Sequence, residues 1–179
     1  IVDAGIRTGA DVESTSGNVE VAADSTTRVQ AFAVGGSFAS KVGIGGSVSV
    51  AEGTNSVTAT IDGTSGVTAD GNVLVTASDD VDIFSLAGNV AGAGSAAIAV
   101  ANSTLVTHNL VEATLGAGAT VSARGNGTAG RIYTGDKDAS GNRTKEDVTG
   151  LAVSAASFEN LQTIAAGGAG GGKVGIAGS

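Results

Sequence analysis

The sequence of 179 residues contains no cysteine, proline, methionine or tryptophan, and aromatic residues make up only 3% of it. Without cysteine the chain can form neither disulfides nor zinc–thiolate sites. Proline lacks a backbone N–H and is confined to sheet edges and bulges, so a chain whose strands pair on both sides should exclude it. The scarcity of aromatics predicts a core of small and branched aliphatic side chains, unlike that of an immunoglobulin-type sandwich, which buries a large aromatic residue.

Clusters of lysine and arginine are also missing. The formal net charge is −8 and the isoelectric point is near 4.4, which argues against a nucleic-acid partner because such proteins gather basic residues into a patch. No apolar run approaches the roughly 20 residues of a membrane-spanning helix. The sequence begins without methionine and inside a repeat, so we expect it to be a fragment of a longer chain whose targeting signals lie elsewhere.

The chain repeats itself with a period of about 54 residues, a size that is typical of stacked supersecondary units. GNVEVAAD at 17–24 returns as GNVLVTASD at 71–79 and more loosely as GLAVSAAS at 150–157. The last copy comes later than this period predicts, so about 24 extra residues enter the third repeat. We therefore assign repeats to approximately 6–60, 61–114 and 115–179, with an insert at 124–149 that leaves and re-enters the stack at one turn.

The repeats contain strand patterns and no helix signal. In VTATI at 57–61 and VEATL at 111–115, apolar residues that should point inward alternate with outward threonine or glutamate. Stretches 28–50 and 82–105 are so rich in glycine, alanine and serine that both faces should be nearly free of large side chains. Glycine at this density also implies close backbone approach, so the layer there should be thin.

These patterns predict an all-β fold, a right-handed parallel β-helix (β-solenoid) that covers 1–179 as a single domain with one inserted loop. Each repeat would form three coils of about 18 residues or two of about 27, and the sequence leaves both open. The competing fold is a string of small antiparallel sandwiches. It is less favoured because hairpin signals are few, and the one Asn-Gly pair, Asn126-Gly127, lies in the insert.

The insert is the most charged stretch and contains the only tyrosine. Counted from Asp136, oxygen-bearing side chains occupy positions one, three, five, seven, nine and twelve of a calcium-loop pattern, with glycine at position six. Aspartate at position twelve, Arg143 at position eight and the lack of flanking helices favour a solvated charged loop instead. The candidate calcium ligands are Asp136, Asp138, Ser140, Asn142, Thr144 and Asp147.

Asp79, Asp80 and Asp82 form a small acidic cluster that could supply paired carboxylates for polysaccharide cleavage. Their equivalents one repeat earlier are Ser25, Thr26 and Arg28, so acidic residues do not recur at the same positions of successive repeats. We interpret the three aspartates as solvated turn residues. His108, the only histidine, is expected in a turn and has no assigned role, so we predict no catalytic residues, no enzyme and no cofactor besides the possible calcium ion.

The pattern G-x-V-x-V-x-A at 17–23, followed by GIGGSVSV at 43–50 and NSVTATI at 55–61, resembles the repeats of very large bacterial filamentous adhesins. Haemagglutinin-like and leukotoxin-type exoproteins exported by two-partner secretion are the nearest group. The likeness covers nearly everything except the insert. Asn102 and Thr104 depart from it, because they stand where the earlier repeat has Val48 and Val50. This departure leaves open which side chains of that strand point inward.

The resemblance implies export from a Gram-negative cell through an outer-membrane secretion partner, and display at the cell surface or release. It implies a role in virulence, with host-cell or matrix surfaces, neighbouring bacterial cells and neighbouring repeats as partners. We expect a non-enzymatic spacer and display segment of an adhesin. The alternatives are a segment of a leukotoxin-like exoprotein that contacts host cells and a polysaccharide-acting β-helix enzyme.

Overall fold

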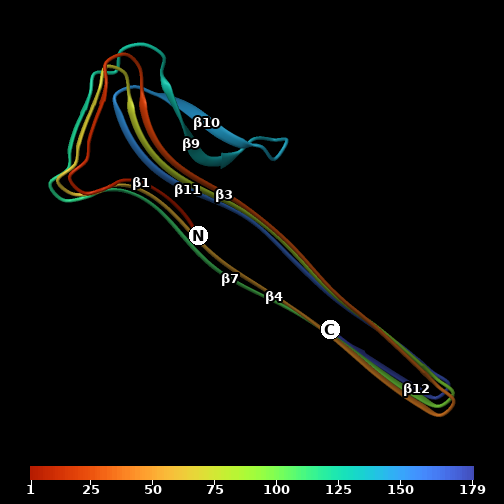
Figure 1. Ribbon diagram of the computed structural model, residues 1–179. Helices are drawn as coiled ribbons and strands as arrows, with labels where there is room; N and C mark the ends of the chain where they lie inside the picture. Colours follow the sequence, from red (N-terminus) through yellow and green to blue (C-terminus); the bar gives the residue numbers. More distant parts are fainter. The chain divides into compact units, whose positions relative to one another are not determined.

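The computed structural model describes residues 1–179, of which 78% lie in strands and none in a helix. No helix long and apolar enough to span a membrane is therefore found. Figure 1 labels most of the strands. Their bounds are β1 Val2–Ile6, β2 Asp11–Ser14, β3 Val19–Ala39, β4 Val42–Ile61, β5 Gly66–Ala69, β6 Val73–Ala93, β7 Ala96–Leu115, β8 Thr120–Ala123, β9 Gly130–Lys137, β10 Arg143–Val148, β11 Leu151–Gly171 and β12 Val174–Gly178.

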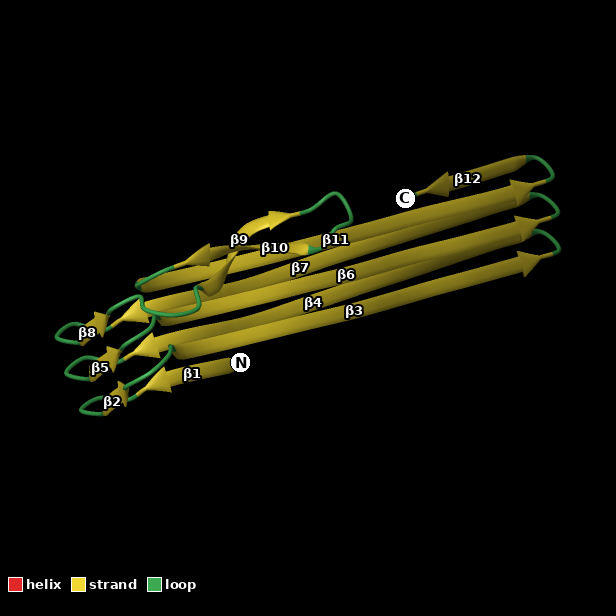
Figure 2. Ribbon diagram, turned by 90° about the horizontal axis from the view of Figure 1, so that it is seen from above, coloured by secondary structure: helices red, strands yellow, loops and turns green.

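Strands of successive repeats pair in parallel. The stacked sheets have the orders β1-β4-β7-β12, β3-β6-β11 and β2-β5-β8, and Figure 2 shows their strands side by side. Each residue pairs with its equivalent one repeat later, as in Val12↔Val67 and Val67↔Val121. One turn of the chain therefore takes a whole repeat, so the prediction of two or three coils per repeat is wrong. The stacking is consistent with a β-solenoid and not with antiparallel sandwiches.

The chain divides into two compact units. Unit 1 comprises Ile1–Thr27, Asn55–Val81 and Asn109–Glu159, and unit 2 comprises Arg28–Thr54, Asp82–His108 and Asn160–Ser179. The long strands β3, β4, β6, β7 and β11 each contribute residues to both units. Each unit has an interior of its own kind.

Unit 1 packs branched aliphatic side chains between its three sheets. Along β4, Val57, Ala59 and Ile61 are buried and alternate with partly exposed Thr58 and Thr60, which confirms the predicted alternation. Full burial of a valine or isoleucine contributes roughly 1.5–3 kcal/mol. The core cluster consists of Val21, Ala23, Val57, Ala59, Ile61, Val67, Ala69, Val73, Val75 and Ala77.

Unit 2 has two sheets with mainly small and polar side chains between them, and a large exception is Ile83, which is fully buried. Ser49 on β4 shares a hydrogen bond of 2.9 Å with Ser85 on β6, and Ser85 shares one of 2.8 Å with Ser103 on β7. A Cβ atom added to Gly43 on β4 would lie 2.8 Å from the carbonyl oxygen of Gly92 on β6. The predicted thin layer is confirmed.

The outer faces of unit 2 carry the large side chains. Val34 and Phe38 on β3 are 79% and 80% exposed, and Ile44 on β4 is 67% exposed. The prediction that both faces of these strands are nearly free of large side chains is therefore wrong. Branched and aromatic residues point outward because the sheets lie too close together to hold them. Asn102 and Thr104 are exposed in the same way as Val48 and Val50, so the facing of that strand is unchanged.

A matched pair of glycine substitutions tests the thin layer. We expect Gly43→Ala to lower the free energy of unfolding by about 1–3 kcal/mol, because its methyl group would press on the opposite sheet. At Gly36 the nearest atom to an added Cβ is Phe38 Cε2 at 3.7 Å, so Gly36→Ala should change stability by less than about 1 kcal/mol. Guanidinium unfolding followed by far-UV circular dichroism measures both. Equally small losses of stability in the two variants would show that the two sheets can separate at no cost.

Candidate functional site

The insert forms a hairpin of β9 and β10 on unit 1. Gly125 N donates to Gly71 O at 2.8 Å, as Gly71 N donates to Gly17 O one repeat earlier. A Cβ atom on Gly125 would lie 3.3 Å from Gly150 N, so the exit and re-entry points are adjacent. This confirms that the insert leaves and re-enters at one turn without disturbing the register of the stack.

The hairpin covers two apolar side chains that point outward from the stack. Leu74 on β6 and Phe158 on β11 are only 3% and 4% exposed, and Gly130 at the start of β9 lies directly against Leu74. In the first repeat, which the hairpin does not cover, the equivalent positions are the exposed residues Glu20 and Thr26. At both positions, the residue under the hairpin is apolar and its uncovered equivalent in the first repeat is polar.

Two cations of the hairpin fasten it to β6. Arg143 Nη1 donates to Ser78 Oγ at 3.1 Å, and Arg143 Nε lies 3.9 Å from Asp80 Oδ2. Lys137 Nζ lies 3.7 Å from the other carboxylate oxygen of Asp80. The guanidinium carbon of Arg143 is 4.4 Å from the ring centre of Tyr133. Such cation–π contacts add roughly 0.5–2 kcal/mol each, and more when water is excluded.

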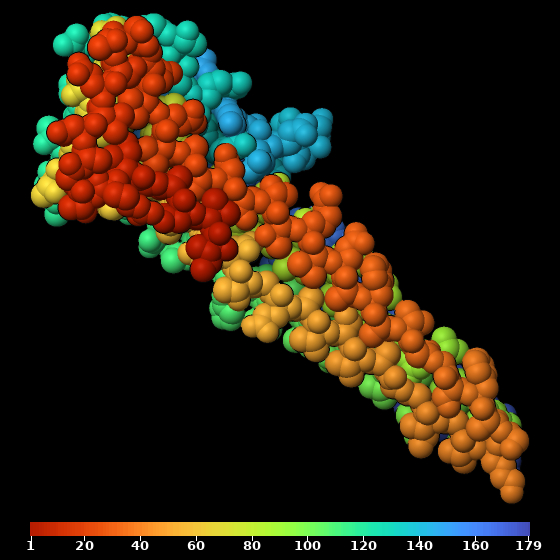
Figure 3. Space-filling view, in the orientation of Figure 1, coloured from red at the N-terminus to blue at the C-terminus, as the bar shows by residue number.

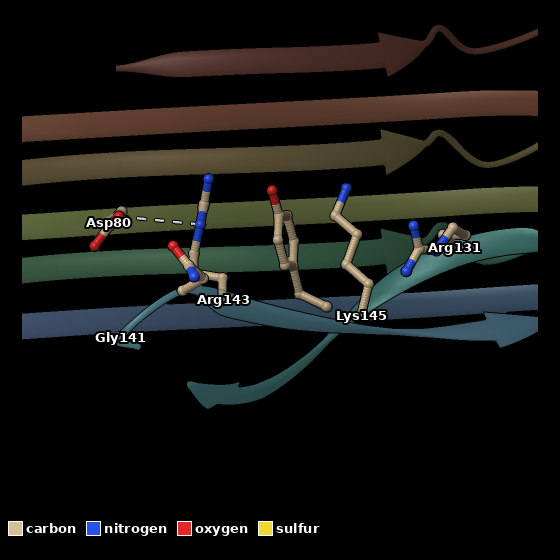
Figure 4. Close-up of a pocket in the computed structure, with 7 residues that line it drawn as sticks. Asp80, Arg131, Gly141, Arg143 and Lys145 are labelled. Carbon is tan, nitrogen blue, oxygen red and sulfur yellow. Dashed lines mark ion pairs between the residues drawn. The ribbon is translucent and has the colours of Figure 1, made fainter. Parts of the chain in front are cut away.

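Beside this attachment lies a pocket of about 370 Å³. Figure 4 shows the side chains of Arg131, Arg143 and Lys145 on one side of the hairpin, with Asp80 facing Arg143. Lys145 Nζ lies 4.2 Å from the Tyr133 ring centre and makes no ion pair, whereas Arg131 Nε lies 3.3 Å from Asp147 Oδ1. The lining residues are Asp80, Arg131, Tyr133, Gly141, Asn142, Arg143 and Lys145.

The pocket is suited to an anion. Three cations and one carboxylate line it, in a chain whose net charge is −8. Arginine can present two parallel N–H groups to a carboxylate or sulfate, and lysine adds a mobile point charge. No protein-family model, curated protein or solved structure matches the chain. The functional proposal therefore rests on these side chains, which the sequence marked only as a charged stretch with the single tyrosine.

The predicted calcium ligands are spread along the hairpin. Asp136 lies on β9, Thr144 and Asp147 lie on β10, and the other three lie in the turn. Asp138 accepts hydrogen bonds from the backbone N–H groups of Asn142 and Ser140, each at 2.8 Å. These bonds and one from the Asn142 side chain hold the pKa of Asp138 below its usual value. No three acidic, histidine or cysteine side chains gather to hold a metal ion, and the calcium site stays a prediction.

The acidic cluster lies within β6 and not in a turn, so that interpretation was wrong. Asp79 is buried and accepts a hydrogen bond of 3.2 Å from Asn55 Nδ2, whereas Asp80 points outward to the hairpin. Asp82 also points outward and lies 3.3 Å from Arg28 Nε. Neighbouring residues of a strand face opposite sides, so Asp79 and Asp80 do not form a pair. His108 lies exposed on β7 and not in the expected turn.

Proposed function

We propose that this chain is a structural repeat and spacer segment of a secreted or surface-displayed bacterial adhesin, folded as a right-handed β-solenoid. Parallel pairing between equivalent strands of successive repeats supports this, because each repeat completes the hydrogen bonds of the next. A long stack of this kind holds attached groups away from a cell surface. Export from a Gram-negative cell by a two-partner system, and attachment to host-cell, matrix or bacterial surfaces, belong to the same proposal. Under this proposal the segment is not an enzyme.

The hairpin is the recognition element of this proposal. Its pocket binds an anionic group of a surface carbohydrate, such as a uronate carboxylate or a sulfate. The observation that carries this step is the gathering of Arg131, Arg143 and Lys145 around one pocket in an acidic chain. Arg143 also anchors the hairpin, which leaves Arg131 and Lys145 as the residues that contact the ligand.

Binding to immobilised heparin, which carries both carboxylate and sulfate groups, tests the pocket. We expect Arg131→Gln with Lys145→Gln to weaken binding at least about tenfold, because two charge-assisted hydrogen bonds are lost. Arg28→Gln removes a cation of unit 2 that is also paired with a carboxylate, and should leave binding unchanged. Binding should also fall as salt is raised. If the double variant binds as tightly as the parent chain, the pocket is not the site.

A second variant separates the scaffold from the recognition element. Removing residues 126–149 joins Gly125 to Gly150 and gives the third repeat the same length as the first two. The same variant carries Leu74→Glu and Phe158→Thr, copied from the exposed equivalents in the first repeat. These substitutions replace the two apolar side chains that removal of the hairpin would expose. We expect this variant to keep its far-UV circular dichroism spectrum and to lose heparin binding. Retained binding would contradict the assignment.

A further inference from the structure

The two units differ sharply in charge. Unit 1 has six basic and fifteen acidic residues, which gives it a net charge of −9. Unit 2 has three basic residues and only Glu52 and Asp82 as acidic residues, which gives it a net charge of +1. Between residues 30 and 50 the only charged side chain is Lys41, in the turn between β3 and β4. The outer faces of unit 2 are therefore almost uncharged.

Unit 2 also reverses the usual distribution of apolar side chains. Its interior holds serine, glycine, alanine and asparagine, and two of the buried polar atoms, Ser47 Oγ and Asn89 Oδ1, have no partner. Most of its valine, isoleucine and phenylalanine residues lie outside, with Ile83 as a buried exception, and Figure 3 shows the β3 and β4 segments, in orange, at the surface. Monomeric proteins rarely expose large contiguous apolar patches unless the patch binds something.

The outward residues of β4, β7 and β12 form a continuous surface that we term the aliphatic face. Ile176 on β12 pairs with Ile98 on β7, and Ile44 occupies the equivalent position one repeat earlier, on the neighbouring strand β4. In the next row Val100 pairs with Gly178. The face thus alternates ridges of branched side chains with gaps at glycine. Its exposed members are Val42, Ile44, Val48, Val50, Val100, Val174 and Ile176.

The outer face of the other sheet is less suited to docking. The Phe38 ring lies against Gly92, where an added Cβ would be 2.7 Å from the ring, and the Phe32 and Phe84 rings are tilted by 50° with their centres 5.7 Å apart. These aromatic rings already have partners within the sheet. Phe38 fills the gap at Gly92 on that sheet, whereas no side chain covers Gly46 or Gly178 on the aliphatic face, so the gaps of the aliphatic face stay open to a partner.

We propose that the aliphatic face docks on the same face of a second copy of this chain. Two uncharged faces meet without like-charge repulsion, and the ridges of one can enter the glycine gaps of the other, as in the packing of two sheets about 10 Å apart. A lipid phase is a poorer partner. It would offer no hydrogen bonds to the exposed residues Asn102 and Thr104 on this face.

The charge of unit 1 gives this association a characteristic dependence on salt. Each copy carries −9 in unit 1, so two copies repel one another at low ionic strength. Added salt screens this repulsion and does not weaken apolar contacts. Association should therefore tighten several-fold as sodium chloride is raised. Association through ion pairs would weaken instead.

Sedimentation equilibrium of the 179-residue chain tests the proposal. We expect a reversible dimer that Ile44→Thr with Val48→Thr weakens about tenfold or more, because two apolar groups per copy are lost from the contact. Val34→Thr with Val90→Thr makes similar changes on the other sheet and should leave the dimer unchanged. Threonine keeps the strand preference, and circular dichroism confirms the fold of each variant.

Three outcomes would overturn the proposal. The first is a chain that stays monomeric at its highest soluble concentration in high salt. The second is equal weakening by both pairs of substitutions. The third is a monomer that instead floats with vesicles of phosphatidylcholine and phosphatidylglycerol, which would identify the face as a lipid-binding surface. None of these depends on the hairpin pocket, so heparin binding and self-association succeed or fail separately.

Discussion

Replacing Asn72 with aspartate is expected to lower the free energy of unfolding by about 3–5 kcal/mol at neutral pH, because it leaves a buried charge without a cationic partner. Asn72 is fully buried and joins three parts of unit 1. Its Nδ2 donates to Asn18 Oδ1 and to Thr128 O, each at 2.9 Å, and its Oδ1 accepts from Gly150 N at 2.7 Å. The first repeat, the hairpin and the third repeat all depend on this one amide.

The aspartate would keep the bond from Gly150 and lose both donors. Its second oxygen would face two other acceptor oxygens, those of Asn18 and Thr128, at a fully buried position. Burial and repulsion would raise the pKa of the new carboxyl above its unfolded value of about 3.9. A raised folded-state pKa makes the loss of stability largest above that pKa. The loss should shrink as the pH falls from the folded-state pKa towards about 4, where the folded-state carboxyl is protonated and the unfolded-state carboxyl is about half protonated.

Guanidinium unfolding at pH 7 and pH 4, followed by far-UV circular dichroism, measures this effect in a chain without tryptophan. Asn102→Asp is the matched control, since Asn102 is exposed and its Oδ1 only accepts a bond from Thr104 Oγ1 at 3.0 Å. An aspartate can accept the same bond, so the change should stay within about 0.5 kcal/mol. A small loss of stability in Asn72→Asp, or a large one that does not depend on pH, would show that the Asn72 amide does not hold the first repeat, the hairpin and the third repeat together.

The period of the stack could be predicted because identical segments report their spacing directly. The number of coils per repeat could not, because one, two or three coils per repeat all give the same period in the sequence. The pairing of each residue with its equivalent one repeat later, as in Val67↔Val121, shows that one turn takes the whole repeat. The Gly-Asn pairs that begin at 17, 71 and 125 mark the position of Asn72 in the sequence. Their role appears only once the strands are stacked.

Alternation along a strand separates two faces but does not say which face is inside. In β3 the large apolar residues occupy odd positions up to Val29 and even positions from Phe32 onward, while the odd positions face inward throughout. In β6 the same change falls between Ile83 and Phe84. This change of phase falls within the first few residues of unit 2 along each strand. It was present in the sequence, and the density of glycine and alanine concealed it.

The pocket of the hairpin was harder to foresee. Arg131, Tyr133 and Lys145 come together only through the pairing of β9 with β10, in which Lys145 is opposite Tyr133. A register shift between Arg143 and Lys145 interrupts that pairing, so spacing along the chain does not give the neighbours. Asp80 joins the pocket from β6, a strand of the preceding repeat. The high density of charge in the insert was predictable, and its geometry was not.

Large apolar residues point inward in unit 1 and mostly outward in unit 2. We therefore predict that truncating an isoleucine lowers the free energy of unfolding much more in unit 1 than in unit 2. Ile61 on β4 is 0% exposed in the core of unit 1, so Ile61→Ala should lower the free energy of unfolding by about 2–5 kcal/mol through lost burial and the cavity left behind. Ile44 lies on the same strand, on the aliphatic face of unit 2. Ile44→Ala should change the stability of the monomer by no more than about 0.5 kcal/mol.

Guanidinium unfolding at low protein concentration and low salt, where copies stay apart, compares the two variants. The difference between them arises entirely from which side of the strand each isoleucine occupies, because the residue, the substitution and the strand are the same. If the interior of unit 2 were able to hold a branched side chain at this point of β4, Ile44 would turn inward and its truncation would be as damaging as that of Ile61. Equal losses would therefore contradict the small-residue interior and, with it, the outward aliphatic face on which self-association depends.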